Sequence, residues 1–106
     1  MSYRLYIGIP EDLGNSQEMY SFSKKQHEEL FALIKSTGQN YGLLSEMQDY
    51  YEFNNYSVTE IEYLTEEINQ LMRNNALKDN HVLMNLLQIG GEAKSKEFQL
   101  MGIGED

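Results

Sequence analysis

The sequence predicts an α+β fold, mostly helical, in which three to four helices pack on a small sheet formed by the N- and C-terminal strands. Two observations predict this class. Hydrophobic residues alternate with a period of two near both ends of the chain, and between them they recur at spacings of three and four. The length of 106 residues and the hydrophobic content of 41% fit a single domain, 1–106, with one core.

The first strand is predicted over residues 3–9, YRLYIGI, because aromatic and branched residues alternate there with others. Four apolar residues share one face of this strand: Tyr3, Leu5, Ile7 and Ile9. Pro10 lacks a backbone N–H and is predicted to end it, and residues 11–18 are predicted to form a loop.

The first helix is predicted to begin at Ser23, because Ser23 and Gln26 have the spacing of a capping box, in which each side chain bonds the other residue's backbone N–H. Residues at spacings of three and four form its buried face: His27, Leu30, Phe31 and Ile34. Gly38 is predicted to mark its end, since glycine readily adopts the left-handed conformation found there.

A second, shorter helix is predicted from a stripe at helical spacing that consists of Leu43, Leu44, Met47, Tyr50 and Tyr51. Asn54 and Asn55 are predicted to break this helix, because asparagine favours turns.

The third helix is predicted from Ser57 to about Asn74. Ser57 and Glu60 form a second capping box, and Tyr56 and Ile61 stand at the two positions of a hydrophobic staple. One apolar stripe runs along this segment: Val58, Ile61, Leu64, Ile68, Leu71 and Met72.

A last helix is predicted over DNHVLMNLLQI, capped by Asp79 or Asn80, with a core face of Val82, Leu83, Leu86 and Leu87. Two glycines, Gly90 and Gly91, leave undecided where this helix ends. Glycine disfavours a helix, yet its small size suits close packing. The segment FQLMGI at 98–103 is predicted to be a strand that pairs with residues 3–9.

The charge and composition exclude several classes of function. Seventeen acidic residues against eight basic ones give a net charge of −9, which disfavours binding to nucleic acid or to an anionic membrane. The first residues, MSYRLYIGIPED, lack the pattern of a signal peptide, and no apolar run is long enough to span a bilayer. The chain has no cysteine, so we expect a cytoplasmic protein without disulfides.

The sequence contains no motif that indicates catalysis, a metal ion or a cofactor. Its two histidines, His27 and His81, lie on different predicted helices without a second ligand at metal-binding spacing. The glycine pairs are not followed by a helix start that would hold a phosphate. We therefore expect a protein that is not an enzyme and that has neither a metal site nor a cofactor.

The most informative segment is acidic. Residues 36–72 contain no lysine or arginine, and residues 48–67 alone contain six carboxylates and five aromatic rings. Unbalanced charge steers a basic partner toward such a surface, and tyrosine is common at binding hot spots. Nine residues are predicted to contact a partner: Asp49, Glu52, Tyr56, Glu60, Glu62, Tyr63, Glu66, Glu67 and Gln70. In the alternative interpretation Tyr50, Tyr51 and Phe53 belong to the core and the carboxylates form a solvated face.

Four segments together carry a resemblance to a known group of proteins: YRLYIGIP, SVTEIEYLTEEINQLM, LMNLLQI and FQLMGIGED. With them the chain resembles bacterial immunity proteins of contact-dependent growth inhibition and related polymorphic toxin systems. The resemblance implies a cytoplasmic antitoxin that binds the C-terminal toxin domain of a cognate effector, commonly a nuclease, and blocks it. It assigns no residue of this chain a role.

The leading hypothesis is therefore an acidic immunity protein that occludes a basic toxin domain, because a domain that holds phosphates carries positive charge. Two alternatives stay open at this point. One is a regulatory adaptor or self-associating module. The other is a small hydrolase that pairs a carboxylate with His27 or His81, which requires the two groups within hydrogen-bond reach in a cleft.

Overall fold

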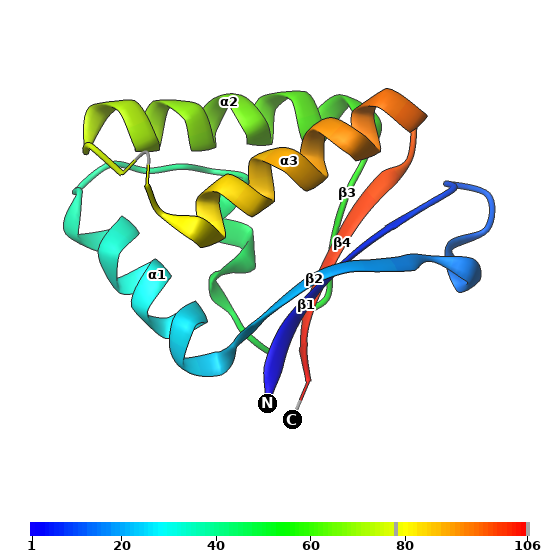
Figure 1. Cartoon of the computed structure of the whole chain (residues 1–106), viewed down its shortest axis with the longest axis horizontal. Coiled ribbons are helices and arrows are strands. Elements are labelled where there is room, and N and C mark those ends of the chain that lie inside the picture. Colours follow the sequence, from blue (N-terminus) through cyan, green and yellow to red (C-terminus); the bar gives the residue numbers. More distant parts are fainter. Residues whose placement is uncertain (78, 106) are drawn as a thin grey trace.

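The computed structural model of the chain describes residues 1–77 and 79–105. In chain order its elements are β1 (Ser2–Gly8), the 3₁₀ turn η1 (Leu13–Asn15), β2 (Gln17–Ser23), α1 (Lys24–Ser36), the 3₁₀ helix η2 (Leu44–Gln48), β3 (Asn54–Tyr56), α2 (Val58–Asn74), α3 (His81–Lys96) and β4 (Gln99–Glu105). Figure 1 shows the helices gathered on one side of the sheet. The predicted α+β class is confirmed.

The sheet is antiparallel and has the strand order β2-β1-β4-β3. β1 and β4 pair along their whole length, from Ser2 opposite Glu105 to Gly8 opposite Gln99, so the predicted pairing of the two terminal strands is confirmed. This places the start of β1 beside the end of β4 (Figure 1).

The prediction of a loop over residues 11–18 is wrong at its end, because β2 begins at Gln17 and forms a hairpin with β1. β2 is an edge strand, and only Phe22 of its residues is buried. A strand with so little buried surface does not show the apolar alternation that a half-buried strand shows. A register shift opposite Leu5 and Tyr6 further interrupts the pattern.

The prediction of an α-helix from the stripe at 43–51 is also wrong. The segment forms the short 3₁₀ helix η2 and then turns into β3, where the sequence suggested only a break. Leu44, Met47 and Tyr50 are buried as predicted, and their spacing of three matches the three residues per turn of a 3₁₀ helix. Tyr51, by contrast, is 57% exposed.

The predicted starts of α1, α2 and α3 are confirmed. Both capping boxes are present, at Ser23 for α1 and at Ser57 for α2, and the Asn80 side chain caps α3. The buried stripes of α1 and α2 lie on the predicted faces. No helix in residues 1–77 and 79–105 has the length and apolar content that a bilayer span requires.

The sequence left open whether the last helix ends at the double glycine. In the structure α3 continues through Gly90 and Gly91 and ends at Lys96. At Gly90 the helix lies close against α2, because a Cβ there would lie 2.7 Å from Cγ2 of Thr65. At Gly91 a Cβ would meet nothing within 4 Å. Gly90 therefore permits the close approach of α2 and α3, and Gly91 does not contribute to it.

Candidate functional site

The nine residues predicted to form one binding surface lie in different settings, and Tyr56 departs most from the prediction. Its side chain has 0% of its surface exposed, and its hydroxyl donates a 2.7 Å hydrogen bond to the carbonyl oxygen of Leu43. Tyr56 belongs to the core and holds the segment that precedes η2. Its predicted place on a binding surface is wrong.

Glu60 and Glu67 stabilise the fold. The Glu60 carboxylate accepts a 3.0 Å bond from the backbone N–H of Ser57 and so completes the capping box of α2. The Glu67 carboxylate accepts bonds of 3.1–3.2 Å from the backbone N–H groups of Leu43 and Leu44 at the start of η2. Both carboxylates therefore have internal partners.

A shallow hollow on the outer side of α2 contains two further predicted residues. Its lining consists of Glu62, Thr65, Glu66, Asn69 and Arg73. Glu62 forms a 3.5 Å ion pair with Lys94 of α3, and Arg73 lies in the same hollow. These two cations offset part of the negative charge. On the same helix Tyr63 is 59% exposed and Gln70 is exposed, so both remain accessible to a partner.

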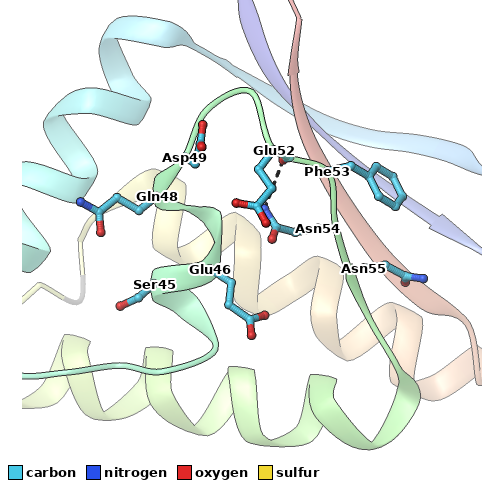
Figure 2. Close-up of a pocket in the computed structure, with 8 residues that line it drawn as sticks. All are labelled: Ser45, Glu46, Gln48, Asp49, Glu52, Phe53, Asn54 and Asn55. Carbon is cyan, nitrogen blue, oxygen red and sulfur yellow. Dashed lines mark hydrogen bonds between the residues drawn. The ribbon is translucent and has the colours of Figure 1, made fainter.

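The last two predicted residues, Asp49 and Glu52, line a larger open hollow of about 680 Å³. Its lining, drawn in Figure 2, consists of Ser45, Glu46, Gln48, Asp49, Glu52, Phe53, Asn54 and Asn55. The residues come from η2, from β3 and from the turn between them. We call this feature the acidic hollow, because its described lining contains three carboxylates and no basic residue.

The carboxylates of the acidic hollow have no cationic partner within residues 1–77 and 79–105. None of the ion pairs found there includes Glu46, Asp49 or Glu52. Figure 2 shows Glu46 projecting from η2 and Glu52 from the turn before β3 toward the space between these two elements. Asn54 lies beside Glu52, and its Nδ2 donates a 3.3 Å bond to the Glu52 carbonyl oxygen (Figure 2). This arrangement leaves negative charge available to a ligand.

Neighbouring elements fix η2, which forms one wall of the acidic hollow. Nε2 of His27 on α1 lies 2.7 Å from the Met47 carbonyl oxygen. Glu67 on α2 holds the other end of η2, as described above. After η2, the backbone N–H of Gly104 donates a 2.8 Å bond to the Tyr50 carbonyl oxygen. Contacts with α1, α2 and β4 thus position this irregular segment.

Two buried tyrosines lie within the field of the surrounding carboxylates. Burial raises the pKa of Tyr3 to about 12, and the charge of Glu52 acts in the same direction, whereas the adjacent Asn54 side chain opposes it. Burial also raises the pKa of Tyr56 above its ordinary value, with smaller contributions from nearby charged groups that include Glu46 and Glu67. Both hydroxyls therefore stay neutral near neutral pH.

Phe53 is the exposed aromatic ring of the acidic hollow, with 54% of its surface accessible. Tyr51 is equally exposed, but its hydroxyl accepts a 2.8 Å bond from Lys24, whose Nζ also lies 4.9 Å from the centre of the Tyr51 ring. Sequence reasoning left open whether Phe53 belongs to the core, and the structure places it at the surface.

The two histidines do not form the arrangement that the hydrolase alternative requires. His27 is 2% exposed, and the hydrogen bond found at its ring goes to a backbone carbonyl. His81 is exposed in the first turn of α3, and none of the hydrogen bonds or ion pairs found in the described part of the chain joins its ring to a carboxylate. The structure gives no support to acid–base catalysis by this pair of residues.

Glu46 is the main residue of the acidic hollow that sequence reasoning missed. It lies within the stretch 36–72 that lacks positive charge, and this signal identified the region but not the residue. Its place in the same hollow as Glu52 depends on the turn between η2 and β3, which a periodic pattern does not reveal.

Comparison of the chain with protein-family models, with curated proteins and with solved structures found no match. The functional interpretation therefore depends on the geometry and charge of the site.

Proposed function

We propose that this chain is an acidic immunity protein of the cytoplasm that binds a basic toxin domain, of the nuclease class, through the acidic hollow. The observation that carries the proposal is the set of carboxylates of Glu46, Asp49 and Glu52, which lack cationic partners in the described residues and open to solvent beside Phe53. This combination offers charge attraction together with an aromatic anchor.

The physical argument links the charge of the chain to its partner. A nuclease domain needs a positively charged groove to hold the phosphates of its substrate. Carboxylates that pair with the basic residues of this groove take the place of the phosphates, and the bound protein excludes the nucleic acid. The net charge of −9 accelerates the encounter at low salt, and the hollow defines where the complex forms.

Calorimetric titration against the toxin domain encoded in the neighbouring reading frame tests this function. We expect tight binding with 1:1 stoichiometry and inhibition of the toxin. The affinity should fall as the salt concentration is raised. The variant Glu46→Gln/Asp49→Asn/Glu52→Gln should bind at least about tenfold more weakly, because three charge contacts are lost together.

A matched control removes the same charge elsewhere. Glu11→Gln/Glu28→Gln/Glu29→Gln alters three exposed carboxylates outside the acidic hollow and should leave the affinity within about twofold of the wild type, since only general steering is reduced. Equal losses in both variants would show that the overall charge, and not the hollow, determines binding.

The adaptor alternative predicts a different result. A self-associating module shows a molecular mass that rises with concentration in the absence of any partner. The charge of −9 on each copy opposes such association at low salt. Sedimentation at several concentrations and two salt levels separates this alternative from the proposed inhibitor.

A further inference from the structure

β3 is an edge strand of the sheet, and among the described residues no strand pairs with its other side. The strand order places β4 on the other side, paired from Asn54 opposite Gly102 to Tyr56 opposite Leu100. In an antiparallel pair, backbone N–H and C=O groups point alternately toward and away from the partner strand. β3 therefore presents backbone groups to its free side, which is a template for another strand.

The free side of β3 borders the acidic hollow. Residues of β3 and of the preceding turn form one wall, and residues 45–49 of η2 and its end form the other (Figure 2). Asn54 lies on the helix side of the sheet, where it is 7% exposed, whereas its neighbour Asn55 is exposed. The unpaired strand edge and the uncompensated carboxylates are independent features, and they meet at one place.

We propose that the free edge of β3 receives an extended basic segment of the partner protein, which adds to the sheet as a fifth strand. This inference rests on the proposed function, because it takes the partner to be basic. Backbone hydrogen bonds to β3 hold the segment. Its lysine or arginine side chains lie toward Glu46 and Glu52, and the residues between them lie toward Phe53 on the open face.

The charge of the chain determines which occupant the edge accepts. A second copy of this chain would bring its own edge strands, Gln17–Ser23 or Asn54–Tyr56, neither of which contains a basic residue. It would also place carboxylates against carboxylates. In a segment where basic residues alternate with neutral or apolar ones, the backbone can hydrogen-bond to β3 while the basic side chains pair with the carboxylates of the acidic hollow. This is possible because the side chains of a strand alternate between its two faces.

A peptide of four Arg-Thr repeats, acetylated and amidated at its ends, is the probe. Its matched control has the same sequence with every backbone nitrogen methylated, which keeps the charge and removes all N–H donors. Binding is followed by ¹⁵N–¹H NMR of the labelled full chain. We expect the largest shifts at the amides of residues 52–56 and slower hydrogen exchange within β3.

The methylated peptide should bind at least about tenfold more weakly, because ladder hydrogen bonds cannot form. The variant Glu46→Gln/Glu52→Gln should weaken binding of the unmodified peptide, whereas Glu28→Gln/Glu29→Gln should not. Equal binding of both peptides, shifts confined to other elements, or no shift at millimolar peptide would each overturn strand addition. The titration with the toxin domain tests the proposed function independently of the peptide. If the chain binds the toxin domain but not the peptide, strand addition is wrong and the proposed function still holds.

Discussion

Nε2 of His27 lies 2.7 Å from the carbonyl oxygen of Met47, and this contact joins α1 to η2 across the core. The imidazole ring also packs against two aromatic rings at centroid distances of 4.8 Å, those of Tyr3 and Phe31. Because η2 forms one wall of the acidic hollow, this buried side chain on α1 contributes to the position of Glu46, together with the contacts of Glu67 and Gly104.

The His27 contact predicts a loss of stability in mild acid. Burial lowers the pKa of His27 below its ordinary value of 6.5, and the bond to Met47 opposes this effect. The unfolded chain therefore binds more protons as the pH falls below about 6.5, so the free energy of unfolding decreases there. At pH 7.5, His27→Phe should cost about 1–3 kcal/mol, because the Met47 carbonyl loses its donor.

Urea denaturation between pH 7.5 and pH 5 measures this effect. The difference in unfolding free energy between the wild type and His27→Phe should shrink as the pH falls, since only the wild type must protonate a buried imidazole. His81→Asn, which changes an exposed residue, should follow the wild type. A constant difference across the pH range would contradict the prediction.

Tyr3 and Tyr56 are predicted to respond oppositely to loss of the hydroxyl. The Tyr3 hydroxyl is buried and, although the Asn54 side chain lies near enough to lower its pKa, it makes no hydrogen bond of ordinary geometry in the described part of the chain. Tyr3→Phe should therefore leave stability unchanged or raise it by about 1 kcal/mol. Tyr56→Phe should cost about 1–2 kcal/mol, because it removes the bond to the Leu43 carbonyl. Thermal and urea unfolding at pH 7 measure both, and Tyr63→Phe at an exposed position is the control.

The raised pKa of Tyr3 also predicts a loss of stability at alkaline pH. Its pKa is raised to about 12 by burial, so the unfolded chain releases this proton near pH 10 while the folded chain still holds it. The free energy of unfolding should therefore fall as the pH rises from about 10 toward 12, and Tyr3→Phe should reduce the slope. A slope identical in the wild type and the variant would show that Tyr3 is not the group responsible.

The two glycines of α3 are predicted to respond oppositely to alanine. Gly90→Ala places a methyl group 2.7 Å from Cγ2 of Thr65 and should cost about 1–3 kcal/mol through overpacking. Gly91→Ala enters open space and should stabilise the chain by about 0.5–1 kcal/mol, because alanine favours a helix. Thermal unfolding of the two variants provides the comparison, and similar midpoints would contradict the close approach of α2 and α3.

Glu67 is predicted to affect folding more than its neighbour Glu66. Glu67→Ala leaves the N–H groups of Leu43 and Leu44 without their acceptor and should cost about 1–3 kcal/mol. Glu66→Ala alters an exposed side chain and should change stability by less than about 0.5 kcal/mol. Urea unfolding of both variants measures the difference.

Local patterns predicted the features that depend on local geometry. Ser23, Ser57 and Asn80 cap their helices as the sequence indicated, because a cap involves residues only three positions apart. The alternation in β1 and β4 also predicted their pairing, since both strands lie in the centre of the sheet and bury one face.

Features that depend on distant contacts were not predicted. β2 and β3 are edge strands whose sequences lack a continuous apolar pattern, and η2 is too short for its period to be distinguished from an α-helix. The candidate site shows the same limit. The missing positive charge in residues 36–72 identified the region. In the folded chain, however, Tyr56 is buried, Glu67 binds the start of η2, and Glu46 lines the same hollow as Glu52.

The position of β4 has a consequence for how the molecule is made. This strand comes last among the elements of the chain, yet it lies between β1 and β3. While residues 99–105 are still inside the ribosome, β3 lacks the strand with which it pairs in the described sheet, and of this sheet only the hairpin of β1 and β2 can form. The wall of the acidic hollow that β3 provides should therefore assemble only after synthesis of this last strand, as a late step of folding.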